Sequence, residues 1–137
     1  MPSIVFLLGK YYPEVDANII CCNNIINQLR SDGNKVIVIA GTTNDPSHNF
    51  VNGVEVYRVK NAESEKYNNR QKSRGVKKAA YRIARMAKSF IGISTFPDVE
   101  PKFSKSLFQM LETICKEQQV DCIIGAFRPY STIKAML

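Results

Sequence analysis

The loop that follows the first apolar run of the chain carries residue types well suited to binding. Residues 3–9 are almost wholly apolar, and residues 10–18 then bring together lysine, tyrosine, carboxylate and amide side chains. A helix that begins near Asp16 would direct its free backbone N–H groups into this region, an arrangement that suits a phosphate. A carboxylate at Asp16 would compete with an anion for those donors, and a simple helix cap at Asp16 is the alternative.

Other signatures of chemistry are missing from the sequence. Neither G-x-G-x-x-G nor G-x-x-x-x-G-K-[ST] occurs. The single histidine, His48, lies in a polar stretch and is expected on the surface rather than in a catalytic triad. The four cysteines, at positions 21, 22, 115 and 122, form no C-x-x-C pair, so we expect buried free thiols and no metal site.

A strongly basic segment follows in the middle of the chain, with no acidic residue between Glu65 and Asp98. On a helix, five of its side chains would form a basic stripe: Arg74, Lys78, Arg82, Arg85 and Lys88. The stripe would suit an anionic membrane surface, where each charge is worth about 1 kcal/mol. Contact with nucleic-acid phosphates and a merely solvated helix face are the other two interpretations.

The elements around these residues predict an α/β domain with a Rossmann-like parallel sheet flanked by helices. Apolar runs at 3–9 and 35–40 read as buried strands, and the apolar spacing between them predicts a helix over about 17–31. Strand, helix and strand in this order form a βαβ unit, which implies a parallel pair. Asp16 is the expected N-cap of that helix, and Gly33 is its expected C-terminal stop.

The rest of the chain continues the alternation. We expect a loop over 42–52, a half-exposed or edge strand over 54–59, helices from about 71 or 75 to 90 and over about 102–119, a short buried strand over 121–126, and a helix capped by Ser131. In open parallel sheets, ligands bind beyond the carboxyl ends of the strands. Residues 9–18, 41–44 and 127–130 should therefore meet at one crevice.

Composition is that of a soluble, cytoplasmic-type globular domain. The 137 residues are 45% hydrophobic and 23% charged, with a net charge of +7 that favours an anionic partner. No apolar run approaches the roughly 20 residues of a membrane span, and the first run lacks the basic flank of a signal peptide. The length suits one domain. Because the chain stops just after a strand and a helix start, we expect a truncated domain.

Four segments in order resemble the N-terminal domain of GT-B glycosyltransferases of the group-one (family-four) class. They are Y-Y-P-E-V-D-A-N at 11–18, L-R-S-D-G-N-K-V-I-V at 29–38, G-V-E-V-Y-R-V at 53–59 and D-C-I-I-G-A at 121–126. The paired glycines of the family's first loop are Asp16 and Ala17 here. Its usual histidines are replaced by Asn34 and Ala126. Close contact with a donor diphosphate through the first loop is therefore not expected.

The resemblance implies an acceptor-side domain of a hexosyltransferase-like enzyme of polysaccharide biosynthesis. A further C-terminal domain would bind the nucleotide-sugar donor, no other cofactor would be needed, and the partner would be a glycan or lipid-linked acceptor. The residues expected to line the acceptor side are Lys10, Tyr11, Tyr12, Asp16, Ala17, Asn18, Arg128 and Tyr130. The fragment alone would be inactive, and a peripheral position at the inner face of the membrane would follow from the basic stripe.

Two other functions remain open from the residues. A non-catalytic α/β binding module of flavodoxin or response-regulator type is one, although the acidic cluster of a response regulator is missing from the strand ends. A basic nucleic-acid-binding domain is the other, and its affinity would fall steeply with salt.

Overall fold

The computed structural model describes residues 1–62, 80, 83, 100–126 and 129–137. Its helices and strands are β1 (Ser3–Leu8), α1 (Ala17–Ser31), β2 (Lys35–Thr42), β3 (Ser47–Val51), β4 (Val54–Lys60), α4 (Pro101–Glu117), β5 (Cys122–Gly125) and α5 (Tyr130–Lys134). Of the expected helix from about 71 or 75 to 90, the structure describes only Ala80 and Ile83, both of them helical, and all five residues of the basic stripe lie outside the described residues.

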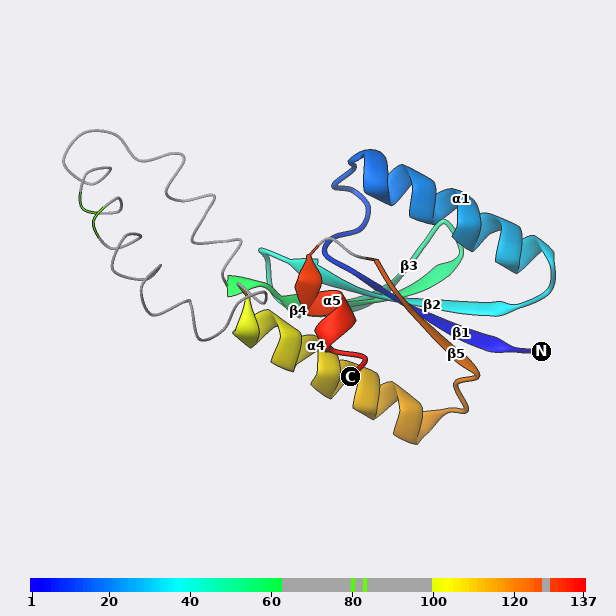
Figure 1. The fold of residues 1–137 in the computed structure, drawn as a ribbon. Coiled ribbons are helices and arrows are strands. Elements are labelled where there is room, and N and C mark those ends of the chain that lie inside the picture. The colour runs from blue at the N-terminus through cyan, green and yellow to red at the C-terminus, as the bar shows by residue number, and fades with distance from the viewer. Residues whose placement is uncertain (63–79, 81–82, 84–99, 127–128) are drawn as a thin grey trace.

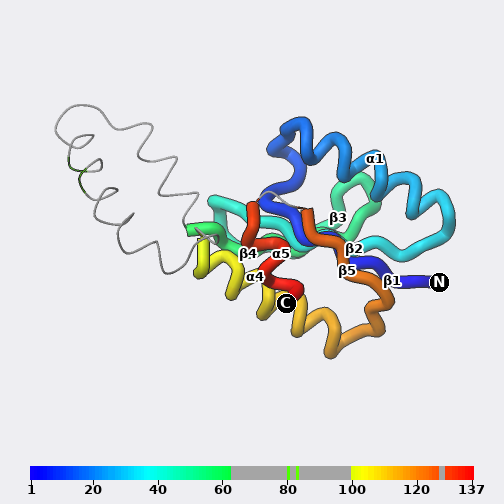
Figure 2. The backbone as a smooth tube through the Cα atoms, in the orientation of Figure 1, coloured from blue at the N-terminus to red at the C-terminus, as the bar shows by residue number. Residues whose placement is uncertain are grey.

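Within the described residues, the strands form one five-stranded sheet in the order β3-β4-β2-β1-β5. β1 pairs in parallel with both β2 and β5, β2 pairs in parallel with β4, and only the β3–β4 pair is antiparallel. The predicted βαβ unit of β1, α1 and β2 is confirmed (Figure 2). The protein therefore has an α/β fold with a mostly parallel mixed sheet flanked by helices, which is compatible with a Rossmann-like fold.

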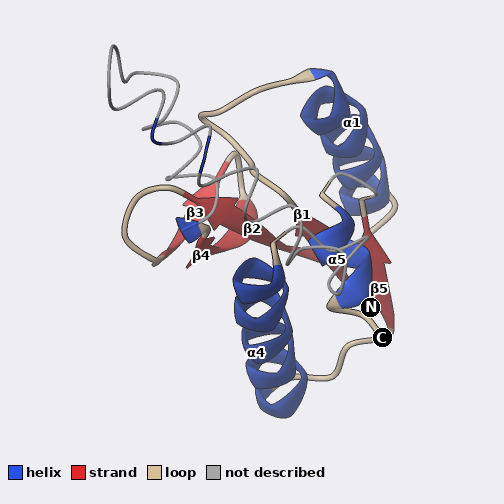
Figure 3. Cartoon of the chain, turned by 60° about the vertical axis from the view of Figure 1, so that its left-hand side comes forward, coloured by secondary structure: helices blue, strands red, loops and turns tan. Residues whose placement is uncertain are grey.

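Helices cover both faces of the sheet, because alternate side chains of each central strand point to opposite sides. On one face, Phe6 and Leu8 of β1 pack with Ile26 of α1. On the other, Leu7 of β1 packs with Phe103 of α4. Figures 1 and 3 show α1 and α4 on opposite sides of the sheet, with α5 on the side of α4. This double coverage explains why β1 and nearly all of β2 are buried.

The ends of α1 follow the sequence prediction. The Asp16 carboxylate accepts a hydrogen bond from the Ile19 backbone N–H at 2.9 Å, which caps the first turn. Gly33 has a φ of +85°, the left-handed conformation that commonly ends a helix and that favours glycine. The amino end of α1 is thereby held at the loop that follows β1.

The prediction of a loop over 42–52 was wrong, because β3 lies within it. Asn52 and Gly53 have φ values of 50° and 76°, which suit a tight hairpin turn between β3 and β4. β3 takes the exposed edge of the sheet, where polar side chains are tolerated. β4 therefore lies inside the sheet rather than at its edge, although its buried and half-exposed side chains alternate as predicted.

The strand predicted over 121–126 is present as β5, but the prediction that it is buried was wrong. β5 is a terminal strand of the described sheet, and its Cys122 and Ile123 side chains are exposed. The expectation of buried thiols fails in the same way. Cys21, Cys115 and Cys122 are exposed, and Cys22 is half-buried against one of the two apolar clusters. All four are free thiols.

The two C-terminal helices agree with the sequence prediction except at one cap. The apolar spacing within 102–119 predicts that Phe103, Leu107, Met110, Leu111 and Ile114 face inward; in α4 four of them are buried and Met110 is half-buried. α5 begins one residue before Ser131, with Pro129 at the N-cap, and the buried Ser131 hydroxyl donates instead to the Glu100 carbonyl at 3.4 Å. Among the helices that the structure describes, none has the length and apolarity needed to cross a membrane.

Candidate functional site

A cavity of about 290 Å³ lies at the carboxyl end of the parallel strands. Its lining comes from the loop after β1, the end of β2, the residue after β4, the start of α1, the residue before α4 and the segment after β5. The lining residues are Leu8, Gly9, Lys10, Glu14, Asp16, Asn18, Ile19, Gly41, Thr42, Thr43, Asn61, Glu100 and Pro129. Segments distant in the sequence thus meet in one place, as the strand-end rule predicted.

The order of the strands explains why the cavity forms there. From β1 the chain moves to β2 and then to β4 on one side, and it later returns to pair β5 with the other side of β1. The connections that leave β1 and β5 therefore diverge, and a crevice opens between them at the carboxyl edge. Residues of both connections, Gly9 and Pro129 among them, line the cavity.

A close backbone approach forms one wall of the cavity. A Cβ atom placed on Gly41 would lie 2.4 Å from the carbonyl oxygen of Gly9 and 2.7 Å from Cζ of Phe103. Only a residue without a side chain allows β2 and the loop after β1 to come this near. Gly41 therefore lies between the cavity, which it lines, and Phe103 of the apolar cluster beneath α4.

The Asp16 carboxylate, which lines the cavity, has two charged or polar partners in its own loop and helix. Its Oδ1 accepts from the Ile19 N–H, and its Oδ2 lies 3.3 Å from Nζ of Lys10. The hydrogen bond from Ile19 lowers the pKa of the Asp16 carboxyl below its ordinary value of 3.8, and Lys10 lowers it further against the opposing effect of desolvation. The carboxylate is therefore ionised whenever the protein is folded near neutral pH.

We expect replacement of Asp16 by alanine to lower the free energy of unfolding by about 1 kcal/mol at pH 7, as loss of an N-cap does. Because the pKa of Asp16 is lower in the folded chain, its contribution is present above the unfolded value near 3.8 and is lost as the pH falls below it. Urea unfolding at pH 7, 5 and 3 should show that the difference in free energy of unfolding between wild type and Asp16→Ala becomes smaller toward pH 3. A difference that grows with acid would contradict this assignment.

The two tyrosines of the first loop hold the loop rather than line the cavity. Tyr11 is 3% exposed and its hydroxyl donates to Oδ1 of Asn23 in α1 at 2.8 Å. Burial raises the pKa of Tyr11, and its ring meets that of Tyr12 edge to face at 5.2 Å. The Tyr12 carbonyl accepts from Nη2 of Arg58 at 2.6 Å, which fastens the loop to β4.

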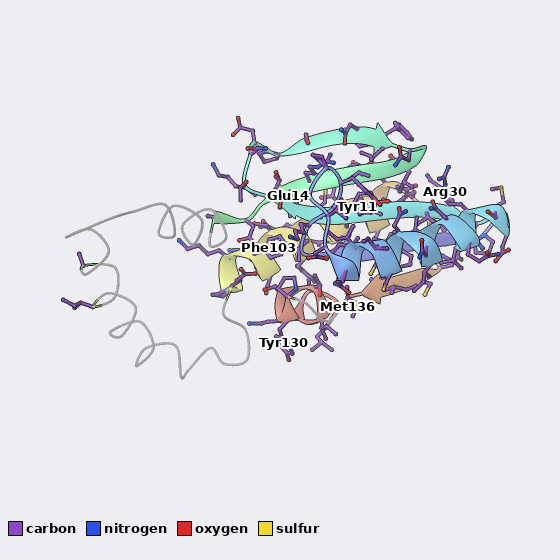
Figure 4. The ribbon with its side chains drawn as sticks, turned by 90° about the horizontal axis from the view of Figure 1, so that it is seen from above. Tyr11, Glu14, Arg30, Phe103, Tyr130 and Met136 are labelled. Atoms are coloured by element: carbon purple, nitrogen blue, oxygen red, sulfur yellow. The ribbon has the colours of Figure 1, made fainter. Side chains whose placement is uncertain are left out.

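The predicted site residues therefore divide into groups. Lys10, Asp16 and Asn18 come together at the cavity. Tyr11 and Tyr12 do not line the cavity, because their rings pack on the core beside α1. Figure 4 shows Tyr130 apart from Tyr11 and Glu14. Neither Tyr130 nor Ala17 lines the cavity. Arg128 lies outside the described residues.

Several lining residues were not singled out from the sequence. Glu14 and Thr43 lie within the segments expected at the crevice, but no motif distinguished them from their neighbours. Asn61 directly follows β4, so the strand-end rule extended to that strand would have found it. No sequence pattern pointed to Glu100, because it reaches the cavity from the amino end of α4, on the face of the sheet opposite to α1.

A second polar cluster lies away from the cavity on β3 and β4. His48 contacts Glu55 at 3.0 Å and stacks on the Tyr57 ring at a centroid distance of 4.1 Å, and the Tyr57 hydroxyl donates to Glu55 at 2.9 Å. Burial raises the pKa of Tyr57 to about 12, and the Glu55 carboxylate adds to the shift. His48 is half exposed, in line with its predicted surface position. These contacts fasten the edge strand β3 to β4.

The described part of the chain holds no group of three or more histidine, cysteine, aspartate or glutamate side chains that could bind a metal ion. The cavity instead offers amide, hydroxyl and carboxylate groups with one lysine. Such groups can hold and orient a polar ligand by hydrogen bonds. Comparison of the chain with protein-family models, with curated proteins and with solved structures finds no match.

Proposed function

We propose that this chain is the N-terminal, acceptor-side domain of a GT-B glycosyltransferase of the group-one (family-four) class. The parent enzyme would move a sugar from a nucleotide-sugar donor to a hydroxyl of a glycan or lipid-linked acceptor. A second Rossmann-like domain would close the cavity and bind the donor. The enzyme would work in the cytoplasm, with the basic stripe (residues 74–88) resting on the anionic inner face of the membrane.

One observation carries the proposal: the first loop and the exit of β5 share a cavity at the carboxyl edge of the sheet. The first loop is one of the segments that resemble the family, and the exit of β5 directly follows another, residues 121–126. The lining supports binding of a sugar, since Asn18, Thr43 and Glu14 offer the amide, hydroxyl and carboxylate groups that hydrogen-bond to sugar hydroxyls. Catalysis in such a cavity would depend on holding the acceptor hydroxyl against the donor, which is a positioning effect.

The test is sugar transfer by the gene product at its full encoded length. Radiolabelled UDP-glucose, UDP-N-acetylglucosamine, UDP-galactose and GDP-mannose would each be incubated with the protein and a membrane extract as acceptor. We expect one donor to label the lipid or polysaccharide fraction. Asn18→Leu, which removes the amide group from the lining and keeps the shape of the side chain, should lower the rate about tenfold or more, a loss of roughly 1.4 kcal/mol in transition-state binding. Residues 1–137 alone should transfer nothing.

The matched control is Asn24→Leu, the same substitution at an exposed position of α1 that does not line the cavity. Its rate should stay within about twofold of wild type. Absence of transfer from all four donors would count against the proposal. The chain could then be tested for binding to duplex DNA. An affinity that falls steeply between about 50 and 200 mM salt, as contacts with phosphates produce, would favour the nucleic-acid function instead of the transferase.

A further inference from the structure

The two groups of the cavity that would bind an anion are both occupied by one side chain. A helix N-terminus and a lysine ammonium are the usual partners of a phosphate in a crevice of this kind. Here the first-turn N–H of Ile19 donates to Oδ1 of Asp16 at 2.9 Å, and Nζ of Lys10 lies 3.3 Å from Oδ2. The Asp16 carboxylate thus stands where a phosphate would otherwise bind.

The other described lining residues supply no second basic group that could bind an anion. Among the described lining residues, Lys10 is the one basic side chain, whereas Glu14 and Asp16 add negative charge to the same loop. Asn18 and Thr43 contribute neutral polar groups. An incoming phosphate would meet the Asp16 carboxylate at close range and would find both donors engaged, whereas a sugar hydroxyl could share them.

We propose that Asp16 is a specificity-determining residue that acts as a built-in anion. It excludes phosphorylated ligands from the cavity and leaves it to an uncharged, hydroxyl-rich ligand, which is a sugar ring without a phosphate. The identification of this ligand as the acceptor rests on the proposed function. The exclusion of anions by Asp16 rests only on the contacts of the cavity.

The direct test is a gain of phosphate binding. Asp16→Ser keeps a hydroxyl that can cap α1 but removes the charge and releases Lys10. Titration of the 137-residue chain with inorganic phosphate at low ionic strength would be followed by the amide NMR signals of Gly9 and Thr43. We expect Asp16→Ser to bind phosphate about tenfold more tightly than wild type, since removal of one like charge at this range is worth roughly 1.4 kcal/mol.

Two variants make the result specific to this site. Asp32→Ser makes the same change of charge at the other end of α1, where Asp32 accepts from Gln28 at 3.0 Å, and it should leave the phosphate affinity within about twofold of wild type. Lys10→Gln added to Asp16→Ser should abolish the gain. Wild type that already binds phosphate as tightly as Asp16→Ser, or a gain that survives Lys10→Gln, would overturn the inference.

A second titration tests the ligand class with glucose and glucose 6-phosphate. In wild type, glucose should shift the Gly9 and Thr43 signals at least as strongly as glucose 6-phosphate does. In Asp16→Ser, the phosphorylated sugar should become the better ligand by about tenfold. A wild-type preference for glucose 6-phosphate, or no shift with either sugar, would overturn the assignment of an uncharged sugar.

The two proposals can fail separately. If the full-length protein transfers no sugar but Asp16→Ser still gains phosphate binding, the transferase function is wrong and the anion-excluding role of Asp16 stands. If sugar transfer occurs but the substitution brings no gain, the role of Asp16 is wrong and the transferase function stands.

Discussion

Replacement of Phe103 by alanine should lower the free energy of unfolding by about 3–5 kcal/mol, the usual range for a large buried aromatic side chain. Phe103 is fully buried in the first turn of α4 and belongs to the apolar cluster between that helix and the sheet. Its ring also lies beneath Gly41 at the wall of the cavity. Urea unfolding followed by circular dichroism at 222 nm would measure the loss, which is large against the 5–15 kcal/mol typical of a whole domain.

The matched control is Phe108→Ala in the same helix. Phe108 is 49% exposed and belongs to neither apolar cluster, so its loss should cost less than about 1 kcal/mol. Equal losses for the two variants would mean that α4 does not pack on the sheet through the face that carries Phe103. The comparison holds the helix and the substitution constant, so it isolates burial.

The second large effect is expected for Gly41→Ala, which should cost about 1–3 kcal/mol by overpacking. The new Cβ would lie 2.4 Å from the Gly9 carbonyl oxygen, a backbone atom that cannot turn away. The end of β2 and the loop after β1 would therefore have to separate, so the amide signals of both segments should shift. Thermal and urea unfolding of the variant would give the loss of stability.

Gly125→Ala is the control for this prediction. Its new Cβ would meet Cε of Met136 at 2.7 Å, but a methionine tip can move away at little cost, and the nearest backbone atom, the Thr132 carbonyl oxygen, lies at 3.2 Å rather than 2.4 Å. The loss should therefore be smaller than for Gly41→Ala, and the reverse order would contradict the close approach of β2 to the first loop. In the double variant with Phe103→Ala, the Gly41→Ala effect should be less than additive, since the ring atoms at 2.7 and 2.9 Å are gone.

The anion-excluding role of Asp16 resolves an apparent conflict between charge and site. The chain carries a net charge of +7, which favours an anionic partner for the protein as a whole. The described cavity lining has more acidic than basic side chains, with Lys10 paired to Asp16. We therefore propose different ligands for the two regions, a membrane surface for the basic stripe and an uncharged sugar for the cavity.

Local patterns along the chain were sufficient for the elements that are buried on both faces or that carry one apolar face. The β-branched run of β2 and the apolar spacing of α4 each predicted the observed element. Asp16 was recognised as a cap because the cap bond joins residues only three positions apart. The crevice followed from topology, since parallel strands end at the same edge of a sheet.

The tertiary structure alone decided which strands lie at the edges and which side chains reach the cavity. β4 becomes internal because β3 pairs with it, and the polar sequence of β3 gave no sign of this pairing. Tyr11 is buried in the apolar cluster beneath α1, and Asn23 in the second turn of that helix accepts a hydrogen bond from its hydroxyl. Glu100 reaches the cavity only when α4 packs across the sheet. Each of these outcomes depends on contacts between distant residues, whose energies are set by the assembled fold and not by any local pattern.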